Sequence, residues 1–364
     1  MKSKTLRDIL SLFFFVLVAI SAFGQNAPER IHQDIQKQTA QIFDSLINIR
    51  RDLHRYPEIS GKEKRTSEKI AEYLIGFGLE VKTNIGGYGV VGILKGAKPG
   101  KKIAWRADID AMPSTAPDVV DFESRNEGVR HICGHDVHTA VALGIANVLS
   151  SQKEQLEGTV YFVFQPSEEN IKGALAMIDD GLFDIIHPEE MYAMHVTPFP
   201  AGTIATKSEE MFSDYKQVHL SFQNVTDNKA LIAFAKRQIR GLENVAPESE
   251  FWNMQNMGDP ELGIAAPNSI YTNFTTVEKN NFSITETENK LEIRAFLSFS
   301  DKKQRDSAIP NLKSQILASP YADKLIKAAL VDVFPTLDNN EKLVNASLAQ
   351  LSTIYGKDKV LRMY

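Results

Sequence analysis

Residues 158–169 read Gly-Thr-Val-Tyr-Phe-Val-Phe-Gln-Pro-Ser-Glu-Glu, an apolar run that ends in two adjacent carboxylates. The continuous apolar stretch from Val160 to Phe164 is typical of a strand that is buried on both faces of a sheet. Functional groups often lie where such a strand ends in a loop, because the sheet holds them rigidly. We therefore predict a buried strand over 159–164, followed directly by a candidate functional loop.

Strands and helices alternate on both sides of this stretch. Apolar residues at helical spacing and short apolar runs predict helices over 31–55, 66–77, 139–149 and 174–180, and strands over 89–94, 102–105 and 191–196. This alternation predicts an α/β domain with a mainly parallel, buried sheet.

The pattern changes near Ser213. Strands are expected over 216–222, 269–277, 290–298 and 328–334, and helices over 228–242 and 302–317. The order β-α-β-β-α-β predicts a small ferredoxin-like sandwich inserted after the first domain. A further helix over 341–355 is expected to return to that domain. The predicted domains are therefore 25–212 together with 335–364, and 213–334 between them.

Length and composition favour a soluble globular protein of about two domains. The chain has 364 residues, of which 43% are hydrophobic and 24% charged. Its 41 basic and 46 acidic residues give a net charge of -5 without a basic stripe. Nucleic acid is therefore not an expected partner.

The N-terminus has the layout of a secretory signal peptide. Residues 1–24 begin with three basic side chains and continue with an apolar run over 9–22, and Ala22 and Gly24 stand at positions -3 and -1 of a cut before Gln25. The alternative is a short membrane anchor, but the run is shorter than the ~20 residues of a spanning helix. We predict a signal peptide over 1–24, a periplasmic or secreted protein, and no stable membrane insertion.

The densest cluster of metal-binding residue types comprises His131, Cys133, His135, Asp136 and His138. Cys133 is the only cysteine, so no disulfide can form within the chain. Thiolate and imidazole are natural ligands of zinc and similar ions, Gly134 allows a tight turn between two of them, and Asp136 can orient a ligand from behind. The alternative is a polar loop before a helix, with a buried, inert cysteine. Three histidines and one cysteine this close together favour a metal site.

Further candidates follow other apolar strands. Of Glu168 and Glu169, one could bind metal while the other stays free as a base, although most Glu-Glu pairs are solvated surface. Asp108 and Asp110 are two residues apart on an extended segment and therefore face the same side; alone, they fit an ordinary strand-end turn. His195 lies in an apolar run, which by itself is more typical of a hydrogen-bonded core histidine than of a metal ligand. It becomes a ligand candidate only because the other candidates exist.

Together these segments resemble the M20 metallopeptidases, specifically the amidohydrolase branch that includes hippurate hydrolases and indoleacetyl-amino-acid hydrolases. The matching stretches, in the family's order, are 50–60, 106–113, 131–140, 158–169, 173–178 and 194–196. The resemblance is close from about Ile42 to Met211 and is one of architecture only from there to Tyr364. The combination of Cys-Gly-His-Asp with a later Glu-Glu is far more specific than either piece alone.

The resemblance implies a site that holds two divalent metal ions (zinc, manganese or cobalt). Its ligands would be Cys133, His135, Glu169 and His195. Glu168 would be the general base that takes a proton from the attacking water and passes it to the leaving amine. Asp110 would support the site from behind the ligands.

The resemblance also implies the substrate class and a role for the inserted domain. Substrates of this branch are N-acyl amino acids or small peptides with a free carboxylate. The inserted domain resembles the family's lid and dimerisation domain, which implies a homodimer. Asn268 and Arg294 lie where that lid could meet a substrate carboxylate.

Two departures from the family pattern favour an alternative, a non-catalytic or impaired relative that binds metal or small carboxylates. The family's lid carries Gly-Gly-His-Ala after its first strand, whereas residues 222–229 here contain no histidine and His219 lies within the strand before them. An oxyanion donor of this kind is worth ~10²–10³ in rate. The family's fifth metal ligand, a histidine after Glu-Asp-Phe, would lie beyond Tyr364, so we expect a C-terminally truncated catalytic domain.

Overall fold

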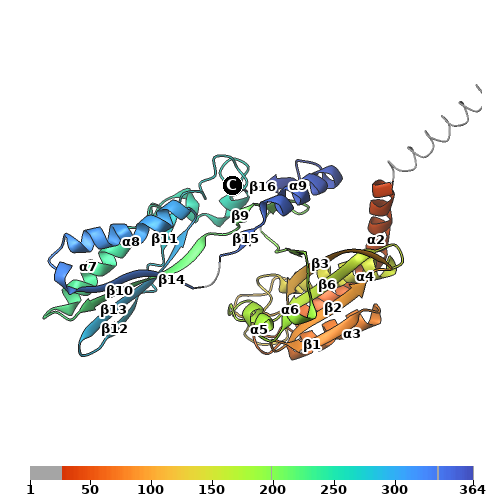
Figure 1. Ribbon diagram of the computed structural model, residues 1–364, viewed down its shortest axis with the longest axis horizontal. Coiled ribbons are helices and arrows are strands. Elements are labelled where there is room, and N and C mark those ends of the chain that lie inside the picture. Colours follow the sequence, from red (N-terminus) through yellow and green to blue (C-terminus); the bar gives the residue numbers. More distant parts are fainter. Residues whose placement is uncertain (1–26, 198, 334–335, 364) are drawn as a thin grey trace, which may run out of the picture. The chain divides into compact units, whose positions relative to one another are not determined.

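The computed structural model describes residues 27–364 except 198, 334, 335 and 364, and it contains two compact units. The first unit ends at Val196 and the second begins at Thr197 (Figure 1). The predicted signal peptide over 1–24 lies outside the described residues.

The first unit is built on a five-stranded sheet with the strand order β1-β2-β6-β3-β7. The strands are β1 (Glu80–Ile85), β2 (Gly89–Lys95), β3 (Lys98–Asp108), β6 (Glu157–Gln165) and β7 (Glu190–Ala193). This confirms the α/β class, but the sheet is mixed rather than mainly parallel. β6, β3 and β7 are parallel, whereas β2 is antiparallel to both of its neighbours. Only residues 86–88 join β1 to β2, and so short a connection requires antiparallel pairing.

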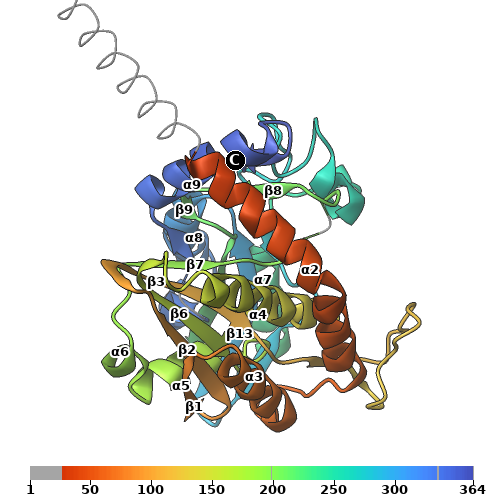
Figure 2. The same ribbon diagram turned by 90° about the vertical axis from the view of Figure 1, so that its right-hand side faces the viewer.

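Helices cover both faces of this sheet (Figure 2). They are α2 (Ala27–Arg55), α3 (Lys64–Gly76), α4 (His135–Ser151), α5 (Gly173–Asp179) and α6 (Leu182–Ile185). Phe162 and Phe164 of β6 pack with α2, α3 and α4, whereas Tyr161 and Val163 pack with α5 and α6. The apolar run in β6 is therefore buried on both sides, as its sequence predicts.

The second unit contains the predicted β-α-β-β-α-β sandwich. Its elements are β10 (Asp214–Gln223), α7 (Asn228–Arg240), β11 (Thr275–Val277), β12 (Ser283–Glu286), β13 (Lys290–Phe299), α8 (Lys302–Leu317) and β14 (Leu325–Asp332). The sheet order is β11-β13-β10-β14, and β12 also pairs with β13. The strand expected over 269–277 begins only at Thr275, because residues 270–273 form turns in which Tyr271 N donates to Ser269 Oγ and Asn273 has a φ of 56°.

Short elements flank the sandwich on either side in the sequence and pair with one another. β8 (Ile204–Thr206) is parallel to β16 (Val360–Arg362), and β9 (Glu209–Glu210) is antiparallel to β15 (Asp338–Asn339). Helix α9 (Glu341–Tyr355) spans the residues predicted for it. Residues on the two flanks of the sandwich are thus paired with one another. Their assignment to the metal-binding domain stays a prediction.

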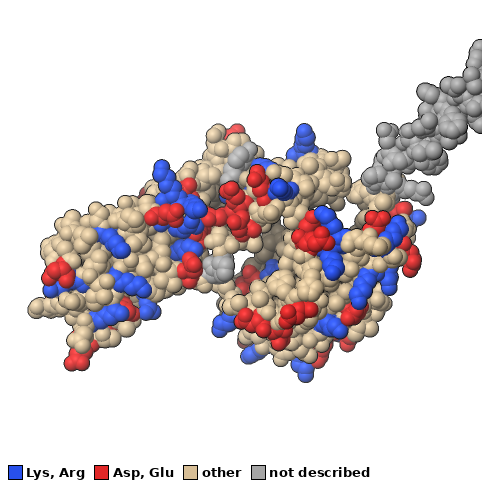
Figure 3. Space-filling view, viewed as in Figure 1, with Lys and Arg blue, Asp and Glu red and all other residues tan. Residues whose placement is uncertain are grey.

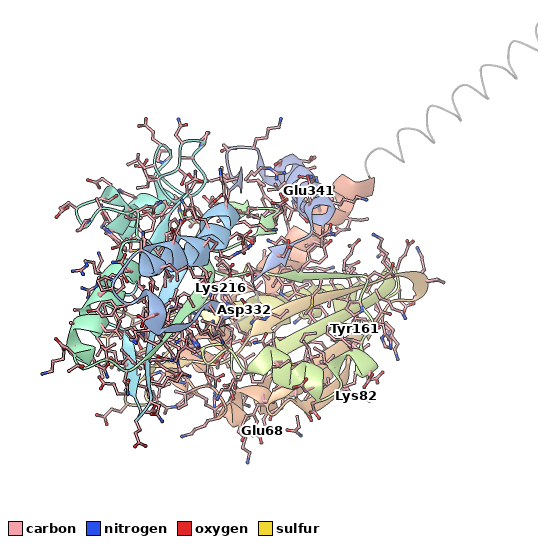
Figure 4. All side chains as sticks on the ribbon, turned by 60° about the vertical axis from the view of Figure 1, so that its left-hand side comes forward. Glu68, Lys82, Tyr161, Lys216, Asp332 and Glu341 are labelled. Carbon is pink, nitrogen blue, oxygen red and sulfur yellow. The ribbon has the colours of Figure 1, made fainter. Side chains whose placement is uncertain are left out.

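A cluster of charged side chains lies at the end of the sandwich where β10 begins. Asp214 is 2% exposed and accepts hydrogen bonds from Arg305 Nη1 at 2.5 Å and Thr336 Oγ1 at 2.8 Å. Lys216 Nζ lies 2.8 Å from Asp214 Oδ1 and 2.7 Å from Asp332 Oδ1 on β14, a pair that is labelled in Figure 4. These bonds join β10, β14 and α8 to the segment that follows β14.

Surface charges of both signs are interspersed on the face of each unit that Figure 3 shows. No helix within the described part of the chain has the length and apolar character needed to cross a membrane.

Candidate metal centre

The candidate residues gather at one edge of the first unit's sheet. Parallel strands β3, β6 and β7 end at Asp108, Gln165 and Ala193, so their carboxyl ends meet at the same edge. The loops that follow them carry the predicted site residues Asp110, Glu168, Glu169 and His195, and α4 begins beside them with His135. His195 therefore lies in a loop after β7 and not within a strand.

His135 is the centre of this group. It is fully buried, and its Nδ1 lies 2.8 Å from the backbone carbonyl oxygen of Asp110. Because a carbonyl can only accept, Nδ1 donates to it, and Nε2 is the ring nitrogen that remains to bind a metal ion once it has lost its proton. Nε2 lies 3.7 Å from Glu169 Oε1 and 3.8 Å from Glu168 Oε2.

Cys133 and His195 complete the group. Cys133 Sγ lies 3.8 Å from His195 Nε2, and the ligand atoms of these two residues and His135 lie within 4.8 Å of one another. Gly134, between Cys133 and His135, has a φ of 83°, and a Cβ there would lie 2.4 Å from Val196 Cγ2. Only glycine fits this turn, in agreement with the sequence analysis.

The residues present fit a metal ion. His135 Nε2 and Glu169 Oε1 are buried and have no hydrogen-bond partner among the described residues, although they lie only 3.7 Å apart. Buried polar atoms are seldom left unpaired, because desolvation without a partner costs about 1–3 kcal/mol. Thiolate, imidazole and carboxylate donors are the set that zinc and related ions prefer. Two groups of such donors share His135: one adds Cys133 and His195, and the other adds Glu168 and Glu169. The four predicted ligands, Cys133, His135, Glu169 and His195, are thus brought together.

The electrostatics of the group also favour a cation. Burial alone would lower the pKa of His135, but the hydrogen bond to Asp110 and the neighbouring Cys133 and Asp108 raise it to about 10. Contacts with His135 and His195 lower the pKa of the Cys133 thiol toward the thiolate form that binds metal. Surroundings that hold a proton on His135 so firmly would also attract a divalent ion in its place.

Asp108 and His138 form a hydrogen-bonded pair beside His135, whose Nε2 lies 3.6 Å from Asp108 Oδ2. His138 Nδ1 donates to Asp108 Oδ1 at 2.6 Å, and the backbone N–H of Val196 donates to His138 Nε2 at 2.9 Å. Both ring nitrogens are therefore used, so His138 is not a free ligand. Instead it anchors the residue next to His195. The spacing of His135 and His138, three residues apart on one helix, is the sequence signal that both face the same site.

Asp136 lies behind the ligand loop and contacts α2. Its Oδ2 accepts from Arg50 Nε at 2.8 Å and lies 2.9 Å from His54 Nδ1, while His54 Nε2 lies 3.0 Å from Asp118 Oδ1. Asp136 thus ties α2 to the start of α4. His131 is also buried, and burial lowers its pKa to about 4.

Glu168 differs from Glu169 and His135 in the exposure of its side chain. Its side chain is 39% exposed, and burial of the remainder raises its pKa, partly offset by His135. Asp110 Oδ2 accepts from the backbone N–H of the neighbouring Glu169 at 3.0 Å, which places Asp110 in support of the loop.

In the second unit, Asn268 is exposed and Arg294 on β13 pairs with Glu292 at 2.7 Å. Their predicted contact with substrate stays a prediction.

Comparison with known proteins identifies similar chains. The family model "Peptidase family M20/M25/M40" matches residues 104–360. Thermostable carboxypeptidase 1 of Saccharolobus solfataricus is 39% identical over 49% of this chain and 45% of its own length. N-acetyldiaminopimelate deacetylase of Streptococcus thermophilus is 39% identical over 49% of this chain and 48% of its own length. The chain thus spans about half the length of these curated relatives.

A solved structure extends the likeness to both units. The YXEP protein of Bacillus subtilis, described as a dinuclear metal binding peptidase from the M20 family, matches with a TM-score of 0.69 and 25% identity over 89% of this chain and 83% of that one. The family model alone covers more than half of the chain. The chain therefore belongs to peptidase family M20/M25/M40.

Proposed function

We propose that this protein is a metal-dependent amidohydrolase that cleaves the amide bond of N-acyl amino acids or small peptides. One observation carries the proposal: the unpaired, buried Nε2 of His135 faces Glu169 Oε1, with the free carboxylate of Glu168 beside them. A base next to a group of metal ligands is the arrangement that metal-assisted hydrolysis needs.

Two divalent ions, zinc, manganese or cobalt, would be held by Cys133, His135, Glu169 and His195. When bound, such ions polarise a carbonyl and lower the pKa of water toward ~7. The dinuclear metal binding described for the YXEP protein supports the number of ions. The soft thiolate and imidazole donors favour zinc within this group.

Glu168 is proposed as the general base. Its carboxylate has no hydrogen bond among the described residues and is exposed enough to reach a substrate. It would accept a proton from the attacking water and donate it to the leaving amine. Because burial raises its pKa above the ordinary value of 4.5, it is a stronger base than a solvated glutamate.

The remaining predictions complete the proposal. Asn268 and Arg294 of the second unit would bind the free carboxylate of the substrate, and the ferredoxin-like sandwich would act as lid and homodimer contact. The signal peptide predicted over 1–24 supports export to the periplasm or beyond.

The alternative is a relative that binds metal or small carboxylates without turnover. The observation that favours it is the turn between β10 and α7, where Asp227 caps the helix by accepting from Ala230 N and no histidine is present. Without an oxyanion donor from that turn, the expected rate falls by ~10²–10³.

An activity screen separates the two functions. The purified chain, loaded with Zn²⁺ or Mn²⁺, would be incubated with N-acetyl and N-benzoyl amino acids while release of the free amine is measured. Release that stops with a chelator and returns with metal supports the amidohydrolase. Stoichiometric metal binding without any release favours the non-catalytic relative.

A further inference from the structure

We propose that Glu63, a buried carboxylate outside the ligand set, is a positioning residue that holds the turn carrying Glu168 and Glu169. The part of this inference that concerns turnover rests on the proposed function. The part that concerns the geometry of the metal ligands does not.

Glu63 is fully buried and is bound to that turn across 104 residues of sequence. Its Oε1 accepts from the backbone N–H of Ser167 at 2.7 Å and from Ser167 Oγ at 3.3 Å. Ser167 directly precedes Glu168, so this bond fixes the chain at the last residue before the proposed base. The buried Oε2 has no hydrogen-bond partner in the described structure. The bonds to Ser167, with contacts to the backbone of Gly61 and of Glu63 itself, stabilise a carboxylate in the core.

The turn needs such an external support. Ser167 has a φ of 53° and Ile171 a φ of 63°, a left-handed conformation that non-glycine residues seldom adopt and that is least favourable for β-branched ones. Both strained residues bracket Glu168 and Glu169. Conformations of this kind persist only where surrounding structure holds them, and the Glu63 bond supplies that hold at Ser167.

Asp110 holds the other side of the turn, at Glu169. Asp110 Oδ2 accepts from the backbone N–H of Glu169 at 3.0 Å and from Ser60 Oγ at 2.7 Å. Ser60 and Glu63 belong to the same short loop between α2 and α3, and Ile59 forms a β-bridge with Ala111. The loop therefore supports the Ser167–Glu169 segment directly at Ser167, through Glu63, and indirectly at Glu169, through Ser60 and Asp110.

The same loop contains a second glutamate, Glu58, whose carboxylate binds the start of α3 and not the turn. Glu58 accepts from the backbone N–H groups of Arg65 at 3.1 Å and Thr66 at 2.8 Å, in the first turn of α3. Glu63 makes no such side-chain bond to α3. Loss of Glu58 should therefore weaken the helix end without moving the turn, whereas loss of Glu63 should move the turn.

The test compares Glu63→Ala, Glu63→Gln and Glu58→Ala in the full chain. Three quantities would be measured for each: Zn²⁺ affinity by competition with a chelating dye, kcat and KM on an N-acyl amino acid, and urea unfolding. We expect Glu63→Ala to weaken Zn²⁺ binding and lower kcat by about 10-fold or more, the range seen when groups behind metal ligands are removed, with KM changed much less. Glu63→Gln should restore both, because its amide oxygen accepts the same bond. Glu58→Ala should lower stability but change Zn²⁺ affinity and kcat by less than about threefold.

Wild-type Zn²⁺ affinity in a folded Glu63→Ala protein, or an equal loss in Glu58→Ala, would overturn the inference. If Glu63→Ala does not fold, Glu63→Asp gives the same test, because a carboxylate one methylene shorter cannot keep the 2.7 Å bond. A wild-type chain without hydrolysis would refute the proposed function alone, since the Zn²⁺ affinities still decide the role of Glu63.

Discussion

The bond from His135 Nδ1 to the carbonyl of Asp110 decides which ring nitrogen faces Glu168 and Glu169. That contact leaves Nε2 on the side of the two carboxylates, where it could bind a metal ion. The adjacent glutamates differ in their surroundings: Oε1 of Glu169 is buried with no hydrogen-bond partner among the described residues, whereas the side chain of Glu168 is 39% exposed.

The first prediction separates these two carboxylates. Glu168→Gln removes the proposed base but no ligand, so amide hydrolysis should fall by ~10²–10⁴ while the bound metal, measured by mass spectrometry, stays at the wild-type level. Glu154→Gln, at an exposed position, is the matched control and should keep full activity. Undiminished hydrolysis by Glu168→Gln would refute the mechanism.

The second prediction concerns the anchor of His195. In His138→Ala, the N–H of Val196 loses its acceptor and Asp108 loses one of its donors while keeping Arg106, so the loop that carries His195 should move. Metal affinity should fall by about 10–100-fold, measured by titration calorimetry. His187→Ala, at an exposed position, should bind metal as the wild type does; an unchanged affinity in both variants would mean that His138 has no part in holding the site.

At the scale of elements, the sequence predicts most of the first unit because apolar periodicity reports burial directly. The run from Val160 to Phe164 predicts β6, and the loop at its end is where the site lies. β1 was not predicted, because in Glu80–Ile85 only Ile85 is buried and little periodicity remains to be read. The roles of Glu63 and His138 were also missed: the Ser167 and Val196 groups that they bind lie 104 and 58 residues away in sequence.

The third prediction tests how α2 is tied to α4. The hydrogen bond to Asp136 raises the pKa of His54 above 6.5, although burial opposes this, and Asp118 adds to the rise. A histidine whose pKa is higher in the folded state stabilises the fold below its unfolded pKa of 6.5 and loses that contribution as pH rises through the folded pKa.

The free energy of unfolding should therefore differ more between wild type and His54→Gln at about pH 5.5 than at about pH 9, as measured by urea denaturation. His187→Gln should match the wild type at both values. If the difference in free energy of unfolding between the wild type and His54→Gln stays constant or grows with pH, the raised pKa of His54 in the folded state is contradicted.

For the whole molecule, each unit has its own hydrophobic core, one around the mixed sheet and one within the ferredoxin-like sandwich. All four predicted metal ligands belong to the first unit. The charged cluster around Asp214 belongs to the second. A change in that cluster should therefore alter stability without altering the ligand set.

The fourth prediction uses this separation. Arg305→Ala removes a charged hydrogen bond to the buried Asp214, while Lys216 remains to compensate, so unfolding should become easier by about 1.5–3 kcal/mol. Lys303→Ala, an exposed position in the same helix, should cost far less. Metal content should be unchanged in both. Loss of metal on Arg305→Ala would show that the site depends on the second unit more than its ligands indicate.

The most direct measurement of the central claim is the number of divalent ions bound by the purified chain, determined by native mass spectrometry after loading with Zn²⁺ or Mn²⁺, for the wild type and for Cys133→Ser. The account predicts two ions in the wild type and their loss in the variant, because Cys133 supplies the only thiolate at the site. A wild-type chain without bound ions, or a Cys133→Ser chain that keeps both, would contradict it.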